Sequence, residues 1–185
     1  MRVLIGVIVF FVMVLLLLLS ANPLYQFVYK PYMAKRLILQ GVVEIGKAAG
    51  SPGDRERLFN AAEAVFGNVE KDYIVNSTEH FNQYGMAYLK AADYGRAFDK
   101  FARSLSIGQD NSETLRNLGA FFARVPDESF RKMNIGALSG AARFPASFSL
   151  KTKGDYALFF YCKSLTAGSG NEESIKGIAG LLSGK

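Results

Sequence analysis

Apolar residues recur every three or four positions through most of the chain after residue 37. The pattern is clearest over 81–105, where Phe81, Tyr84 and Tyr88 fall on one face of a helix and Phe101 belongs to a second helical stretch. Such spacing is typical of amphipathic helices that share a core. Strand-like alternation is confined to 73–75, which is too short to count as a strand. The pattern therefore predicts an all-α protein.

Capping residues and turn signals divide this helical pattern into segments. Residues that accept hydrogen bonds from free backbone N–H groups, often followed by acids that favour a helix N-terminus, recur along the chain. They stand at Ser51-Pro52-Gly53-Asp54, Ser77-Thr78, Asn111-Ser112-Glu113, Pro126-Asp127-Glu128 and Asn171-Glu172-Glu173. The last of them predicts a final helix over 172–182, which either covers the end of the helical array or meets a partner.

The helical segments repeat. One shift along the chain, here called the short shift, places Phe81, Tyr84, Gly85 and Tyr88 on Leu115, Leu118, Gly119 and Phe122. A second, the long shift, places Ala97, Phe101, Ser104 and Leu105 on Ala157, Tyr161, Ser164 and Leu165, and continues from Leu118 to Ile178. A weaker match, the backward shift, places Tyr84 and Gly85 on Ile45 and Gly46. Such repetition indicates stacked units that bury their apolar faces against one another.

Over 78–123 the chain resembles the tetratricopeptide repeat (TPR), a helix–turn–helix unit whose period equals the short shift. The resemblance is partial over 154–182 and faint over 38–67, and it fails at 127–150. There, 127–143 should supply a second helix but lacks its Ala and aromatic positions. The resemblance implies a TPR-like helical domain over 38–185: a short, degenerate array of three to four helical hairpins, which is a small α-solenoid.

TPR arrays typically bind peptide segments in a groove lined by the first helix of each hairpin. By register, the groove positions in this chain are Asn82, Met86, Leu89, Arg116, Ala120 and Ala123. Asn82 and Arg116 resemble parts of the clamp with which one branch of the family holds a peptide carboxylate, whereas Met86 and Ala120 depart from it. We therefore expect an apolar or mixed groove. The alternative is that Asn82 and Arg116 are ordinary surface residues.

The N-terminus carries the longest apolar run, Val3 to Leu19. About 20 helical residues cross a hydrocarbon core, so we expect a single-pass transmembrane anchor over 1–22, with residues 3–22 in the membrane. Residues 23–37 form a juxtamembrane segment rich in tyrosine. A removed signal peptide is the alternative. For the remaining domain, an extracytoplasmic (periplasmic) location is favoured and a cytoplasmic one stays open.

Residues suited to catalysis are scarce. The single histidine, His80, lies in the first turn of an expected helix, and we expect it to be exposed or to cap that helix. The single cysteine, Cys162, lies among aromatic residues, and we expect it to be buried and inert. No phosphate-binding loop or metal-ligand spacing occurs in the sequence. The net charge of +6 is spread along the helices rather than gathered in one run, which argues against nucleic-acid binding. We expect no catalysis, cofactor, metal or small-molecule substrate.

These observations predict a non-catalytic, membrane-anchored, TPR-like adaptor or scaffold. It would bind other proteins or form part of a membrane or envelope complex. The alternative is a small accessory subunit of a membrane complex, held mainly through its transmembrane helix.

Overall fold

The computed structural model describes residues 10–16, 23–73, 77–144, 150–168 and 172–184, which form helices joined by turns and short loops and include no strand. The elements after residue 23 are a π-helical turn η1 (Tyr25–Tyr29), α2 (Lys30–Gly50), a 3-10 turn η2 (Pro52–Asp54), α3 (Arg55–Asp72), α4 (Thr78–Lys90), α5 (Tyr94–Ile107), α6 (Ser112–Arg124), α7 (Asp127–Arg131), α8 (Gly136–Ala142), α9 (Lys153–Ala167) and α10 (Glu172–Leu182). The prediction of an all-α protein is confirmed.

Two predicted helix starts have the expected caps. The Ser77 hydroxyl accepts a hydrogen bond from the His80 backbone N–H at 3.4 Å, and the Asn111 side chain accepts one from Thr114 N–H at 2.9 Å. The expected domain boundary between residues 37 and 38 falls inside α2, whose buried face already begins at Ala34. Residues 74–76, which hold most of the strand-like stretch, and Asn171 lie outside the described residues.

The prediction of a membrane anchor is wrong. Among the described residues, no helix is both long and apolar enough to cross a membrane. Of the expected span over 1–22, the structure describes only residues 10–16 as helix. Residues 1–9 and 17–22 of that expected span lie outside the described part of the chain. The expected single-pass topology and membrane location are therefore wrong, and the transmembrane helix that the alternative accessory subunit requires is not found among the described residues.

Three helical pairs make up the stack: α2 with α3, α4 with α5, and α6 with α9. The third pair is formed across a long intervening segment that contains the short helices α7 and α8, and α8 packs on α5. The second helix of this unit is thus α9 and not 127–143. This arrangement explains the two periods of the sequence, because the short shift relates the first helices α4 and α6 whereas the long shift relates the second helices α5 and α9.

A glycine on the first helix of each pair lets an aromatic ring of the second helix approach its backbone. A Cβ atom added at Gly85 would lie 2.6 Å from the ring of Phe101, and one added at Gly119 would lie 2.6 Å from the ring of Tyr161. In the first pair the ring of Phe66 lies against Gly41, while nothing lies within 4 Å of Gly46. The backward shift that placed Gly85 on Gly46 is therefore wrong, and Gly41 is the equivalent position.

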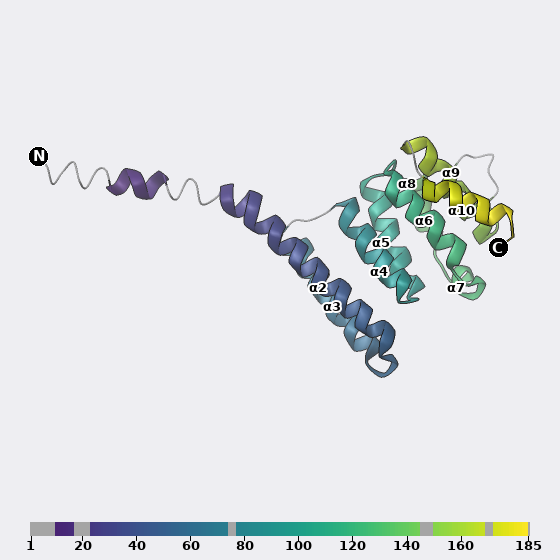
Figure 1. The fold of residues 1–185 in the computed structure, drawn as a ribbon, viewed down its shortest axis with the longest axis horizontal. Helices are drawn as coiled ribbons and strands as arrows, with labels where there is room; N and C mark the ends of the chain where they lie inside the picture. Colours follow the sequence, from purple (N-terminus) through teal and green to yellow (C-terminus); the bar gives the residue numbers. More distant parts are fainter. Residues whose placement is uncertain (1–9, 17–22, 74–76, 145–149, 169–171, 185) are drawn as a thin grey trace, which may run out of the picture.

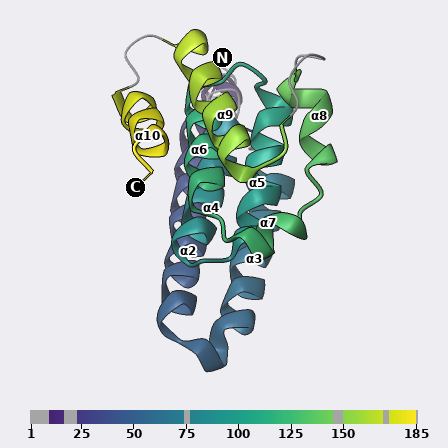
Figure 2. The same ribbon diagram turned by 90° about the vertical axis from the view of Figure 1, so that its right-hand side faces the viewer.

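Aromatic contacts join each pair to the next. Phe66 of α3 stacks on Tyr84 of α4 with ring centroids 3.6 Å apart, and Phe101 of α5 meets Phe121 of α6 edge-on at 6.0 Å. All four rings are fully buried. The stack runs from the long α2–α3 hairpin at one end to α10 at the other (Figures 1 and 2). In this arrangement α4 and α6 are neighbours that contact each other directly.

Candidate functional site

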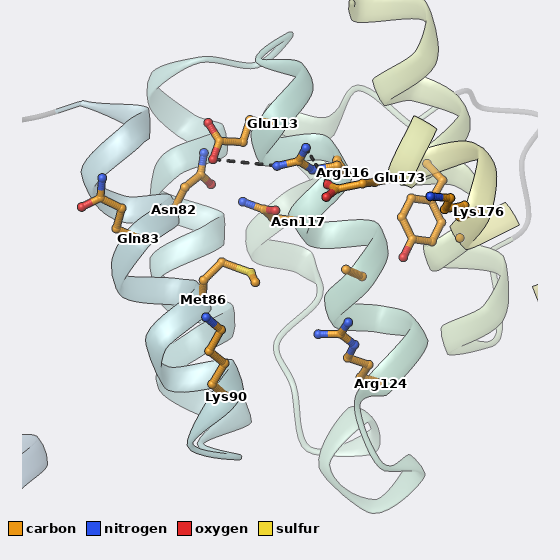
Figure 3. A pocket seen from close by; sticks show the side chains of 13 residues that line it. Asn82, Gln83, Met86, Lys90, Glu113, Arg116, Asn117, Arg124, Glu173 and Lys176 are labelled. Carbon is orange, nitrogen blue, oxygen red and sulfur yellow. Dashed lines mark ion pairs between the residues drawn. The ribbon is translucent and has the colours of Figure 1, made fainter. Parts of the chain in front are cut away.

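A hollow of the described surface lies along α4 and α6 and is bounded on its far side by α9 and α10. Its volume is about 650 Å³. We call it the groove, and Figure 3 shows the side chains that line it. They come from α4 (Asn82, Gln83, Met86, Lys90), α6 (Glu113, Arg116, Asn117, Ala120, Arg124), α9 (Tyr161) and α10 (Glu173, Lys176, Gly177).

Four of the six predicted groove residues line this hollow. Asn82 and Met86 face it from α4, and Arg116 and Ala120 face it from α6. The other two do not: Leu89 is buried in the core, and Ala123 is exposed but is not part of the lining. Two predicted positions of each helix therefore line the hollow, whereas the third predicted position of each immediately precedes a side chain that does.

The residues missed at that third turn are Lys90 and Arg124. The short shift relates them, as it relates Asn82 to Arg116, so the same register could have found them. Asn117 was also missed, because nothing in the sequence pattern indicates that an asparagine next to a repeat position faces the groove. Glu173 and Lys176 reach the groove from α10 only because α10 packs on α6 and α9.

Asn82 lies at the base of the groove and is 1% exposed. Its side-chain amide donates to the Thr114 hydroxyl at 3.0 Å, and that hydroxyl lies 2.8 Å from the Ser104 hydroxyl. The Asn82 carbonyl oxygen is buried without a hydrogen-bond partner among the described residues. An unpaired buried acceptor costs about 1–3 kcal/mol. The neighbouring Asn117 side chain is also mostly buried, and this pair of amides forms the polar part of the groove's base.

Charge in the groove is predominantly positive, with four cations and two acids. Arg116 is held across the groove by Glu173 at 2.7 Å and approaches Glu113 at 4.0 Å (Figure 3). Lys176 pairs with Glu172 at 2.6 Å. Within the described part of the chain, Lys90 and Arg124 make no ion pair. These two cations are therefore available to an acidic ligand at the end of the groove away from Glu113.

The ring of Tyr161 forms the wall between α6 and α10. It lies against the backbone at Gly119 on one side and Gly177 on the other, and only 6% of the residue is exposed. Burial raises the pKa of the Tyr161 hydroxyl, and the positive charges of Arg124 and Arg116 partly oppose that shift. The tyrosine is neutral at physiological pH, and its ring acts in the groove as a packing surface.

The two residues considered for catalysis belong to different helices, His80 to α4 and Cys162 to α9. His80 is half-buried, its Nδ1 lies 2.6 Å from the Ser77 hydroxyl, and burial lowers the pKa of its imidazole. Cys162 is exposed, contrary to the expectation of a buried cysteine. The reason is that the buried face of α9 consists of positions 157, 160, 161 and 164, and residue 162 lies outside this face. The described residues contain no group of three or more His, Cys, Asp or Glu side chains placed to hold a metal ion.

Comparison with known proteins gave no match: no family model, no curated protein and no solved structure is detectably similar to this chain.

Proposed function

We propose that this chain is a non-catalytic protein-binding module, an adaptor or scaffold, that holds an extended peptide segment of a partner protein in the groove. This function agrees with what the TPR resemblance implied, but it does not include a membrane anchor. The observation that carries the proposal is the buried, unpaired carbonyl oxygen of Asn82 at the base of the groove. A donor group that entered the groove and reached this oxygen would remove the penalty of leaving it unpaired.

An extended peptide suits these groups because every residue of its backbone, proline apart, offers an N–H donor and a C=O acceptor. Asn82 provides an acceptor, and the Asn117 amide provides a donor and an acceptor of its own. Between the two amides and the cations, Met86 and Ala120 supply an apolar stretch that fits a small or apolar peptide side chain. The adaptable shape of methionine helps such a surface to accept different side chains.

The unpaired cations add a preference for acidic sequences. Lys90 and Arg124 face each other from the last turns of α4 and α6 (Figure 3). Charge complementarity of this kind accelerates association and selects among partners more than it adds affinity. We therefore propose that the preferred segment carries Asp or Glu at the end that meets Lys90 and Arg124.

A random peptide library, displayed and selected against the full-length chain, tests this function without knowledge of the partner. Affinities of the selected peptides would be measured by fluorescence anisotropy. The groove variant is Lys90→Glu with Arg124→Glu, and the matched control is Lys71→Glu with Arg131→Glu, which changes the net charge equally at exposed cations outside the groove. We expect about a tenfold or greater loss of affinity in the groove variant and little change in the control.

Removing the polar base of the groove gives a second, uncharged comparison. Asn117→Ala should weaken the selected peptides while Thr166→Ala, an exposed position on α9, should not. The proposal fails if the library yields no binding peptides, or if the selected peptides bind the groove variants as tightly as they bind the controls.

A further inference from the structure

The last helix, α10, is the equivalent of α6 in a further unit. In the second unit, the Ser104 hydroxyl of α5 lies 2.8 Å from the Thr114 hydroxyl of the next first helix, α6. At the positions given by the long shift, the Ser164 hydroxyl of α9 lies 2.6 Å from the Ser174 hydroxyl of α10. Both hydroxyl pairs are buried, and both join a second helix to the first helix that follows it. By this contact, α10 begins a new helical pair.

The face of α10 that a second helix would cover is open. On α6 this face comprises Leu115, Leu118 and Phe122, which are fully buried. The long shift takes these positions to Ile175, Ile178 and Leu182. Ile175 is 57% exposed and Leu182 is 75% exposed, while Ile178 is half-buried. In the described part of the chain no helix packs over this face of α10, which we call the open face.

The completed pairs show what covers such a face. Phe101 of α5 lies against Gly85 of α4, and Tyr161 of α9 lies against Gly119 of α6. In each case the covering element is an α-helix of three to four turns with a buried alanine one turn before the ring, Ala97 or Ala157. The occupant that fits the open face is therefore an amphipathic helix that lies along α10.

We propose that the open face of α10 binds an amphipathic helix of a partner protein, which takes the place of the second helix of this unit. The site is separate from the groove, because Glu173 and Lys176 line the groove while Ile175 and Leu182 do not. An apolar face of α-helical period that receives a partner helix is a recurrent mode of protein recognition. The proposal does not depend on peptide binding in the groove.

One residue of the open face restricts which helix can bind. The glycine that accepts an aromatic ring on α4 and α6 is replaced by Ala179 on α10. A Cβ atom at Gly119 would lie only 2.6 Å from the ring of Tyr161. Because Ala179 has such a Cβ atom at the equivalent position, it leaves no space for an aromatic ring of the covering helix. The partner helix therefore presents a branched aliphatic side chain, such as leucine or valine, opposite Ala179.

The α5 sequence, residues 94–107, serves as the probe because α5 covers the equivalent face of α4 in this chain. Two labelled, helix-stabilised peptides would be titrated with the full-length chain: the α5 sequence unchanged and the same peptide with Phe101→Leu. We expect the leucine form to bind about tenfold more tightly than the phenylalanine form. The chain variant Ala179→Gly should restore binding of the phenylalanine form, because it removes the methyl group that excludes the aromatic ring.

A charged residue placed on the open face should weaken binding of the peptide. Ile175→Glu should weaken the leucine peptide about tenfold or more. The matched control is Leu39→Glu, which places the same charge at an exposed apolar position on α2. Groove peptides should bind the Ile175→Glu chain unchanged, so failure of this site can be distinguished from failure of the groove.

Three results would overturn the proposal. The first is absence of binding of either peptide up to about 1 mM. The second is equal weakening by Ile175→Glu and Leu39→Glu, which would place the peptide elsewhere. The third is self-association of the chain, seen by sedimentation and abolished by Ile175→Glu, which would make a second copy the occupant in place of a partner helix.

Discussion

Single glycines decide how closely the helices of each pair approach. At Gly41, Gly85 and Gly119 a ring of the partner helix occupies the space where a Cβ atom would be. These positions are close-packed, and interiors of native density do not absorb even one added methyl group without strain. The equivalence of Gly85 and Gly119 was readable from the short shift. That of Gly41 was not, because the neighbouring residues of α2 lack the aromatic pattern.

The glycines of α2 provide a matched test. Gly41→Ala should lower the free energy of unfolding by about 1–3 kcal/mol, because the new methyl group meets the buried ring of Phe66. Gly46→Ala, in the same helix with open space around it, should raise the free energy of unfolding by about 0.5–1 kcal/mol. Urea denaturation of both variants measures the difference. Equal effects would show that Gly41 is not the closely packed position, and the opposite order would support the register of the backward shift.

At the scale of the elements, buried hydroxyls connect one helical pair to the next. The Thr114 hydroxyl of α6 is within hydrogen-bonding distance of Ser104 of α5, Asn82 of α4 and Asn111 at its own cap, at 2.8 to 3.0 Å. It therefore ties three helices together directly beneath the groove. The pair formed by Ser164 and Ser174 is the simpler version at the last helix.

Replacing Thr114 by valine keeps the shape of the side chain and removes this connection. Thr114→Val takes away the hydroxyl that accepts from the Asn82 amide, and we expect a loss of about 2–3 kcal/mol in the free energy of unfolding. Thr166→Val, at an exposed position on α9, is the control and should change stability little. Thermal unfolding followed by circular dichroism measures both. An effect of Thr114→Val no larger than that of the control would show that the hydroxyl does not join the helices.

At the scale of the whole molecule, the protein is a stack of helical pairs with two ends. Each pair contacts mainly its neighbours, and in such arrays stability is set by the units and by the interfaces between them. The central helices α4, α5, α6 and α9 have neighbours on both sides. By contrast α10 has an exposed apolar face, and α2 exposes Leu39 and Val43.

This arrangement predicts a gradient of local stability. Amide hydrogen exchange, followed by mass spectrometry, should be slowest in α4, α5 and α6 and should be about tenfold or more faster in α10, which has an interface on one side only. Binding of a helix to the open face should slow exchange in α10 specifically. Uniform protection across α4–α10 would mean that the chain unfolds as one unit and that α10 is not a separately opening end.

The groove shows how much of a site the sequence can indicate. Asn82, Met86, Arg116 and Ala120 were found because a helical period is a local property that the repeat copies from one unit to the next. Leu89 was misplaced because an error of a single position rotates a side chain about 100° around its helix. The contributions of Glu173 and Lys176 needed the packing of α10 on α6, which no local pattern records.

The sequence by itself determined the helical class, most helix starts, and the repeat that relates α4 to α6 and α5 to α9. These features follow from the spacing of apolar residues and from capping groups, which act over short distances along the chain. Only the tertiary structure decided that α6 pairs with α9 across the 125–152 segment, that Gly41 is the packing glycine of α2, and that α10 leaves a face open. Those outcomes depend on contacts between residues far apart in the chain, where the fit of particular side chains, such as Tyr161 between Gly119 and Gly177, selects one arrangement.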